Sequence, residues 1–475
     1  MSDSSTEIVA GRKVYRCGTL TYTKMGLVAV FGWLLWGDFV YTLMESVWPQ
    51  ILPLFLLKAG ATPQQTLWIK TTIPQIIGFV ACPMISFKSD RHRGRWGRRI
   101  PFIFWTAPFL SLFLGALGFS AEIIDWMNWS AIPHLLGLSP LATALVIIGL
   151  LGVGFNFFNE FVGSVYWYLF NDVVPKDHMG RFLGWFRFVG AGATLLFGRY
   201  VYPHTLEPGG IKWIFLGAAA LYLVGFALLC WRVKEGEYPP VTDVTERTGV
   251  VKQIALFFRE CFTHPIYVLV FLSTGLGAIG GLAGIGGQVF LLSLGITMGQ
   301  LGNVIGITAL VSMFLQPPCG WVVDKVHPLR VVLATATIGV ALTVLQYFFL
   351  WDWPSYLTFT AAGLVFANIS NAAGIPLLMH IFPRDKYGQF CSANGATKSL
   401  AQVVGSFAAG PFVDWISNCG KYEAGYRLAF LWQAAFAAMS LLCLVGVFVY
   451  WKRLGGDKGY VPPITARPEE ADRIS

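Results

Sequence analysis

The sequence contains few charged residues. Asp, Glu, Lys and Arg make up only 12% of its 475 residues, whereas 55% are hydrophobic. Soluble domains average about 25% charged residues, so this shortage excludes an ordinary soluble protein. A transmembrane helix needs about 20 mostly apolar residues, and this composition allows many such helices. We therefore expect a membrane protein that crosses the bilayer several times.

Several chemical motifs are also missing. The eight cysteines are scattered and include no Cys-x-x-Cys pair, which argues against a metal site or a disulfide framework. No stretch resembles a nucleotide-binding loop, so we expect neither an ATP-driven pump nor an enzyme, and no cofactor. The first 25 residues are polar and basic and lack the short apolar core of a cleaved signal peptide.

Twelve long apolar segments follow one another along the chain. They are residues 26–50, 64–87, 100–121, 140–169, 182–203, 211–232, 265–294, 299–322, 331–351, 355–381, 388–416 and 426–451. The prediction is an all-α polytopic membrane protein with 12 transmembrane helices. The longest hydrophilic interior stretch, about residues 232–259, separates two sets of six.

Basic residues are distributed unevenly between the loops. The net charge is +9, and 26 of the 34 Lys and Arg fall in alternate loops and near the two ends of the chain. Loops rich in Lys and Arg face the cytoplasm, so we predict that both termini are cytoplasmic. Topology thus explains the positive charge, and we expect no nucleic-acid partner.

These observations define five regions. We predict a cytoplasmic N-terminal tail at 1–25, an N-terminal six-helix bundle at 26–232, a cytoplasmic central loop at 233–264, a C-terminal six-helix bundle at 265–452 and a cytoplasmic C-terminal tail at 453–475.

The two halves carry matching signatures after corresponding helices. Asp90-Arg91 follows the second apolar segment, and Asp324-Lys325 follows the eighth. The sequences Pro-Lys-Asp at 175–177 and Pro-Arg-Asp at 383–385 follow the fourth and tenth segments, each with a Gly-x-Phe shortly afterwards. Parallel six-helix repeats build the major facilitator fold, with the substrate site between the halves. We therefore predict that fold.

Charged side chains inside the predicted helices are functional candidates, because a charge within the membrane is costly. Asp38 and Glu45 are seven residues apart and share one helix face with Tyr41 and Trp48. The carboxylates suit proton or cation coupling, and the aromatic rings suit stacking on a sugar. Alternatively, Asp38 is a structural hydrogen-bond acceptor and Glu45 lies near the external rim.

A second polar face lies on the fourth apolar segment. It contains Asn156, Glu160 and Trp167, with Asn159 beside them. Burial disfavours the charged form of a carboxyl group, so Glu160 is a candidate for binding and releasing a proton. Asn156, Asn159 and Trp167 are candidates for substrate binding. The alternative is an interhelical clamp between Glu160 and Arg187.

Lys398 lies near the middle of the eleventh apolar segment. Its repeat-related position is Gly190, so the lysine is not part of the shared scaffold. A lone ammonium group at this depth needs a carboxylate or a water-filled cavity, which suits contact with substrate or a static ion pair between the halves. Weaker candidates for binding sugar hydroxyls, equally suited to interhelical hydrogen bonds, are the amides Gln75, Gln288, Asn368 and Asn371.

The segment 265–294 contains seven glycines. Glycine weakens a helix and also permits close contact between helices. A gating bend and simple tight packing are equally compatible with this pattern.

The basic run from Ser89 to Phe102 suggests a gate. An aspartate beside arginines can form ion pairs that lock the cytoplasmic ends of helices, whereas the alternative is a role in topology alone. The gating candidates are Asp90, Arg95, Gly97, Arg98, Arg99, Arg187, Asp324 and Lys325.

The same run, with its Arg-x-Gly-Arg-Arg pattern, resembles the loop between helices 2 and 3 of sucrose transporters. These belong to the glycoside-pentoside-hexuronide:cation symporter group of the major facilitator superfamily. Phe31-Gly32-Trp33 is similar to that branch as well, and Lys398 matches a helix-11 lysine of the melibiose-type branch. The second segment lacks the acidic residues that melibiose-type carriers use for sodium, which favours proton coupling.

The resulting prediction is a monomeric secondary transporter of the cell membrane that moves a sugar or glycoside together with protons by alternating access. Sodium is the less favoured cation. Its partners would be a small-molecule substrate and the lipid bilayer. One alternative is an exporter or exchanger of organic anions or drugs on the same fold, in which Lys398 contacts a substrate carboxylate. A second alternative is a membrane sensor that does not transport.

Overall fold

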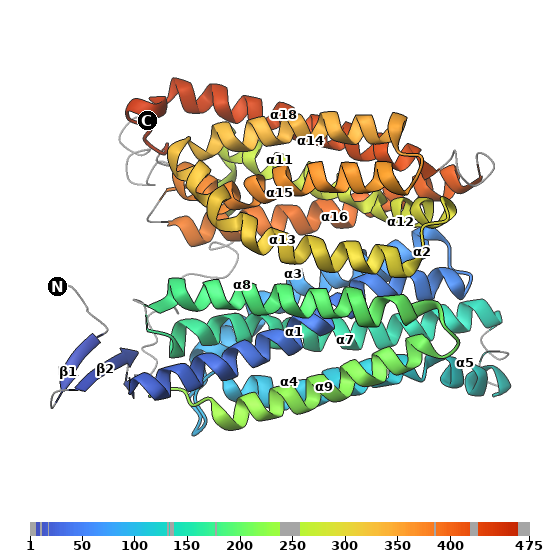
Figure 1. Cartoon of the computed structure of the whole chain (residues 1–475), viewed down its shortest axis with the longest axis horizontal. Coiled ribbons are helices and arrows are strands. Elements are labelled where there is room, and N and C mark those ends of the chain that lie inside the picture. Colours follow the sequence, from blue (N-terminus) through green and yellow to red (C-terminus); the bar gives the residue numbers. More distant parts are fainter. Residues whose placement is uncertain are drawn as a thin grey trace. The chain divides into compact units, whose positions relative to one another are not determined.

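The computed structural model describes residues 6–9, 12–17, 19–130, 133, 137–175, 178–237, 257–383, 386–418 and 426–463 (Figure 1). The chain divides into two units. Unit 1 comprises Met1–Thr242 and Thr297–Met313, and unit 2 comprises Asp243–Ile296 and Phe314–Ser475.

Helices make up most of unit 1. They are α1 (Lys24–Lys58), α2 (Pro63–Leu67), η1 (Trp68–Thr72), α3 (Ile73–Arg91), α4 (Ile100–Gly118), α5 (Ser120–Trp129), α7 (Pro140–Val173), α8 (Met179–Leu196), η3 (Phe197–Val201), η4 (Tyr202–Leu206) and α9 (Gly210–Arg232). Within this unit, α4 packs against α7 and α9, α1 against α8 and α9, and α3 against α7.

Unit 2 is also built from long helices. They are α11 (Pro265–Gly280), η5 (Gly281–Ala283), α12 (Gly284–Ser293), α14 (Pro328–Phe349), α15 (Trp353–Ile381), α16 (Tyr387–Asn418), α18 (Leu428–Arg453) and η7 (Gly456–Lys458). Helix α13 (Met298–Lys325) contributes its first part to unit 1 and its second to unit 2. In unit 2, α11 packs against α16 and α18, and α14 packs against α15 and α18.

The predicted fold class is confirmed. Each of the twelve apolar segments forms a helix or a run of consecutive helices. Within the described residues, nine helices are long and apolar enough to cross a membrane. Helices α3, α8 and α16, which carry Gln75, Arg187 and Lys398, fall outside this set.

Local sequence signals determine several helix boundaries. The Thr23 side chain accepts a hydrogen bond from the Gly26 amide and caps α1. Ser139 caps α7, directly before Pro140 at its first position. Asp352 and Ser355 form a reciprocal capping box at the start of α15. Such caps satisfy amide groups that have no partner within the helix.

Helix α1 is longer than predicted. We expected it to end near residue 50, but it continues through Pro49 and Pro53 to Lys58. A proline inside a helix removes one hydrogen bond and usually ends a soluble helix. In membrane proteins the neighbouring helices satisfy the freed carbonyl groups, so the helix can continue.

The first 25 residues contain strands that we did not predict. Strands β1 (Thr6–Val9), β2 (Arg12–Cys17) and β3 (Leu20–Tyr22) form an antiparallel sheet in this order, with Tyr15 paired to Tyr22. The sheet is attached to the rest of unit 1. Cys17 Sγ contacts the carbonyl oxygens of Asp172 (3.4 Å) and Val174 (3.5 Å).

The glycine-rich segment of unit 2 contains a break. Helix α11 ends at Gly280, a short 3-10 turn follows, and α12 starts at Gly284. Tight packing occurs in the same segment, because a β-carbon on Gly275 would lie 3.0 Å from the Ala401 β-carbon. The segment therefore shows tight packing at Gly275, and the gating role of the break stays a prediction.

Two backbones come unusually close within unit 1. A β-carbon on Gly198 of η3 would lie 2.2 Å from the carbonyl oxygen of Gly302 on α13. No side chain fits at this distance, so the contact requires glycine.

Candidate functional site

Asp38 is the most deeply buried acidic residue of the predicted coupling site. Its side chain is 1% exposed within unit 1. Oδ1 accepts a hydrogen bond of 3.2 Å from Thr42 Oγ1, one helical turn later on α1. Oδ2 is buried and has no hydrogen-bond partner among the described residues. It faces α8, because a β-carbon on Gly190 would lie 3.4 Å from it.

Glu45 lies two turns further along the same face of α1 and links it to α7. Its Oε1 accepts a hydrogen bond of 2.8 Å from Asn159 Nδ2. The Tyr41 side chain is hydrogen-bonded to Glu45 as well. Tyr41 also interacts electrostatically with Glu160 and Asp38. One tyrosine therefore connects the three predicted acids.

Two glycines shape the surroundings of this cluster. Gly163 of α7 makes room for Tyr41, since a β-carbon there would lie 2.7 Å from the tyrosine hydroxyl. Glu160 faces α3, where a β-carbon on Gly78 would lie 3.3 Å from its Oε1. Arg187 is exposed and forms no ion pair with a described residue, so the alternative of a clamp between Glu160 and Arg187 is not observed. Asn159 and Tyr41 connect α1 and α7.

Two further tyrosines, which the sequence analysis missed, border the cluster. Tyr166 of α7 is fully buried, and its hydroxyl donates to the carbonyl oxygen of Leu34. Tyr222 of α9 is equally buried and interacts electrostatically with Tyr41 and Glu45. Its hydroxyl has no hydrogen-bond partner among the described residues. Helical spacing gave no signal for either residue, because both lie in long apolar runs.

The substrate-binding candidates of unit 1 differ in how far they are exposed. Trp48 is 7% exposed and stacks on Phe155 with ring centroids 4.5 Å apart, so the ring face that we expected to contact a sugar is covered. Asn156 is buried and donates to the Gly152 carbonyl oxygen of its own helix (2.7 Å). Trp167, in contrast, is 47% exposed within the structure. Gln75 is half-buried on α3.

Among the substrate-binding candidates of unit 2, one side chain is buried in a hydrogen-bonded pair and two are exposed. Asn368 is buried and accepts a hydrogen bond of 3.1 Å from Gln316 of α13, which the sequence analysis did not identify. Asn371 and Lys398 are exposed, and Lys398 forms no ion pair with a described residue. The Gln288 side chain lies outside the described part of the structure.

The basic turn before α4 is held by an acidic residue at the end of α7. Arg98 Nε lies 2.9 Å from Asp172 Oδ2, and Arg99 Nε lies 3.2 Å from the same oxygen. Arg99 is only 4% exposed and also contacts the Ser89 hydroxyl and the Tyr168 ring. Asp172 was not predicted, because it is more than 70 residues away in sequence.

A second acid closes the turn from the other side. The Glu235 carboxylate accepts hydrogen bonds from the backbone amides of Arg98 (2.9 Å), Arg99 (2.8 Å) and Ile100 (2.6 Å). These amides form the start of α4, where a negative charge is favourable. Gly97 has φ +98°, and a β-carbon there would lie 2.5 Å from Glu235 side-chain atoms. The turn therefore requires glycine at this position.

Two of the remaining gating candidates have described side chains. Arg95 is exposed, and Lys325 is exposed with its ammonium group 3.7 Å from the centre of the Trp321 ring. The side chains of Asp90 and Asp324 lie outside the described residues.

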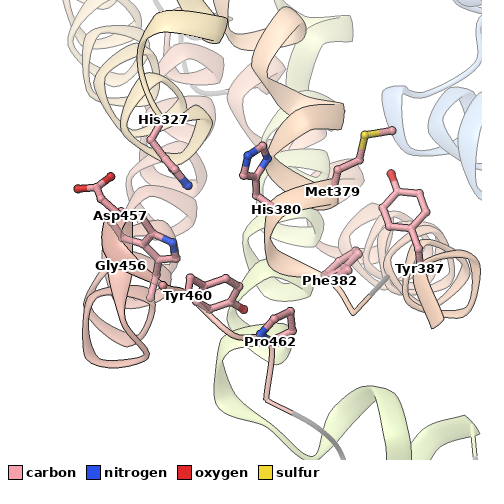
Figure 2. A pocket seen from close by; sticks show the side chains of 11 residues that line it. His327, Met379, His380, Phe382, Tyr387, Gly456, Asp457, Tyr460 and Pro462 are labelled. Carbon is pink, nitrogen blue, oxygen red and sulfur yellow. The ribbon is translucent and has the colours of Figure 1, made fainter. Parts of the chain in front are cut away.

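Unit 2 contains a large cavity. It has a volume of about 850 Å³ and opens between the ends of α14, α15 and α18 in unit 2. Figure 2 shows His327 and His380 at its upper side and Tyr460 and Pro462 below. Tyr460 donates to the Ile381 carbonyl oxygen (3.0 Å), so the chain after α18 closes part of the cavity. Burial lowers the pKa of His327. No predicted substrate or coupling residue lines this cavity.

Comparison with known proteins supports the fold. Residues 280–472 match the family model of the Major Facilitator Superfamily. Solute carrier family 45 member 4 of Homo sapiens is 26% identical over 256 residues, which cover 48% of this chain and 30% of that protein. The chain therefore matches less than a third of that relative's length.

Solved structures are similar over most of the chain. The nucleoside transporter NupG gives a TM-score of 0.63 at 11% identity, covering 88% of this chain and 99% of that one. A D-xylose-proton symporter gives a TM-score of 0.56 at 17% identity, covering 88% and 96%. At such identities the likeness concerns the fold alone. Together with the family match over residues 280–472, it supports a polytopic all-α fold of the major facilitator type.

Proposed function

We propose that this transporter is a proton-coupled symporter of a sugar or glycoside in the plasma membrane. It would act as a monomer with both termini in the cytoplasm. Asp38, Glu45 and Glu160 would bind the transported proton, and Tyr41 would connect them. Substrate and proton would bind together and be released on the other side by alternating access.

The burial of Asp38 carries this proposal. An ionised carboxylate away from water is unfavourable unless hydrogen bonds or a cation compensate its charge. Asp38 has one hydrogen bond from Thr42, an oxygen without a partner and no ion pair within the described residues. Protonation removes the charge and supplies a donor. A change of protonation at Asp38 would therefore alter the stability of this conformation, which is what coupling requires.

The residue types of α3 favour a proton over sodium. Helix α3 has no carboxylate before Asp90. A proton needs only one carboxyl group, whereas a hard cation needs several oxygen ligands.

The sugar assignment rests on hydroxyl-binding and ring-stacking groups. Trp167 and Asn371 are exposed within their own units and remain available to a ligand. The fold itself is compatible with this function, since one structure with the same fold is a D-xylose-proton symporter.

Transport into proteoliposomes tests the proposal. Radiolabelled sucrose and maltose would be offered under an inward proton gradient, an inward sodium gradient, or neither. We expect accumulation only with the proton gradient. Asp38→Asn should abolish accumulation but retain exchange of labelled for unlabelled sugar, because exchange needs no net movement of protons.

Glu122→Gln is the matched control for Asp38→Asn. Glu122 is an exposed acid of unit 1 that pairs with Lys212, so we expect normal accumulation in this variant. Sodium-driven uptake would contradict the proposed cation. Loss of exchange in Asp38→Asn would indicate a structural role for Asp38. Transport of neither sugar would contradict the substrate assignment.

The position of Lys398 supports a second candidate function, the exchange of organic anions. Its ammonium group is exposed on α16 and forms no ion pair with a described residue, so it can bind a substrate carboxylate. In that case Lys398→Gln would abolish anion flux, and Lys398→Arg would retain part of it. Flux would also persist without a proton gradient.

A further inference from the structure

A hollow of about 510 Å³ lies between the ends of α4 and α9 in unit 1. The two helices pack side by side along their length (Figure 1). Both are apolar enough to cross a membrane, and the hollow lies where α4 starts at Ile100 and where α9 ends at Arg232. It is therefore at the boundary between the hydrocarbon region and the aqueous phase, on the side that we predict to be cytoplasmic.

The charges around this hollow are positive. Arg95 and Lys234 line it, both are exposed, and neither forms an ion pair with a described residue. Glu235 is the acidic residue in the lining, but its carboxylate accepts hydrogen bonds from three backbone amides at the start of α4. The two basic side chains thus remain available to an anion.

The walls of the hollow are apolar and aromatic. Trp96 and Trp231 are 57% and 68% exposed, and Phe104 contacts Trp96 edge-to-face at 5.3 Å. Exposed indole rings at the end of a transmembrane helix are typical of the interface with lipid head groups. Arg95 and Trp96 also line a second hollow of about 610 Å³, together with Phe102 and Trp105. A cationic rim above apolar walls fits a molecule with an anionic head and hydrocarbon chains.

We propose that this hollow is a binding site for an anionic phospholipid of the cytoplasmic leaflet. Arg95 and Lys234 would contact the head-group phosphate, and an acyl chain would lie along Trp96, Phe104 and Trp231. Because Glu235 joins the hollow to the basic turn, a bound lipid would contact the same segment that Asp172 holds. The site does not depend on which substrate the protein transports.

Native mass spectrometry of the delipidated full-length protein in detergent tests this site. Dioleoyl phosphatidylserine would be compared with dioleoyl phosphatidylcholine, which has the same chains and no net charge. We expect preferential retention of phosphatidylserine. The double variant Arg95→Gln with Lys234→Gln removes both cations. It should weaken phosphatidylserine binding by about fivefold for each cation removed. The charge-preserving pair Arg95→Lys with Lys234→Arg should retain it.

Lys452→Gln with Arg453→Gln is the matched control, since these are two exposed basic residues at the end of α18. It should leave phosphatidylserine retention unchanged. A large excess of inorganic phosphate should not displace the lipid, whereas displacement would show that the site binds a soluble anion instead. Equal retention of the two lipids, or equal losses in the test and control variants, would overturn the proposal.

Discussion

The hydroxyl oxygen of Tyr41 on α1 occupies the space that a side chain at Gly163 on α7 would need. A β-carbon on Gly163 would lie 2.7 Å from that oxygen. The close approach holds Tyr41 beside Glu45, which Asn159 binds from the same helix α7. A glycine therefore positions the polar group that connects the acids.

Gly163→Ala should disturb this arrangement. The added methyl group forces Tyr41 to move, and overpacking in a filled interior typically destabilises a protein by about 1–3 kcal/mol. We expect lower thermal stability in detergent and loss of substrate accumulation in proteoliposomes. Gly192→Ala is the control, because a β-carbon on Gly192 of α8 would have no atom within 4 Å. Equal behaviour of the two variants would contradict a positioning role for Gly163.

Asp172→Asn should destabilise unit 1. The substitution removes the negative charge that pairs with Arg98 and with the buried guanidinium of Arg99. Breaking a buried ion pair on one side costs about 3–5 kcal/mol. Thermal unfolding of the purified protein would measure the effect. Glu122→Gln breaks an exposed pair with Lys212 and should change the melting temperature little. A similarly small change for Asp172→Asn would show that the turn does not depend on this ion pair.

Glu235→Ala should weaken the start of α4. The carboxylate accepts three backbone amides there, and loss of a helix cap typically costs about 0.5–2 kcal/mol. Limited proteolysis should show faster cleavage within the turn at residues 92–99. Glu237→Ala, two residues later, is the control, since among the described residues Glu237 is bound through its backbone amide, by Thr19. If both variants were cleaved at the wild-type rate, the cap would not stabilise the turn.

His327 should make unit 2 less stable at acidic pH. Burial holds the pKa of His327 below its usual value of about 6.5; His380 and Arg330 lower it further, whereas Asp457 raises it. The unfolded chain therefore binds a proton at a higher pH than the folded protein does. The contribution of His327 to stability is complete above about pH 6.5 and decreases as the pH falls toward the lower folded pKa.

Melting temperatures between about pH 7.5 and pH 5 would measure this effect. His327→Asn retains a side chain that can cap α14, as His327 does by accepting from the Leu329 amide, but it does not titrate. The variant should lose less stability on acidification than the wild type. An unchanged slope in His327→Asn would contradict the prediction.

Hydropathy predicted the helices because each must place about 20 apolar residues in the membrane, a requirement that is visible in local sequence. The strands at Thr6–Tyr22 were missed because short alternating polar segments resemble a solvated tail. Helical spacing placed Asp38, Tyr41 and Glu45 on one face of α1, and the structure connects these residues to Asn159 and Glu160.

Contacts over long sequence distances were not predictable in the same way. Asp172 and Glu235 meet the basic turn from 74 and 137 residues away, and nothing in the local sequence of either residue indicates that partner. Trp48 shares the helical face of Tyr41 but is covered by Phe155, because a single helix face can be polar at one depth and packed at another. Periodicity predicts on which face of a helix a residue lies. It does not predict which neighbouring side chain packs against that residue.

The attachment of the N-terminal sheet has a consequence for biosynthesis. Cys17 contacts carbonyl groups of Asp172 and Val174, and Thr19 accepts the amide of Glu237, which is 218 residues later. Ribosomes add about 5–20 residues per second, so this last partner leaves the ribosome roughly 10–45 s after Thr19 does. The first strands are therefore made early, but the contact of Thr19 with Glu237 can form only after all six helices of the first half have been synthesised. The attachment of the N-terminal segment to unit 1 is therefore completed late in the synthesis of this unit.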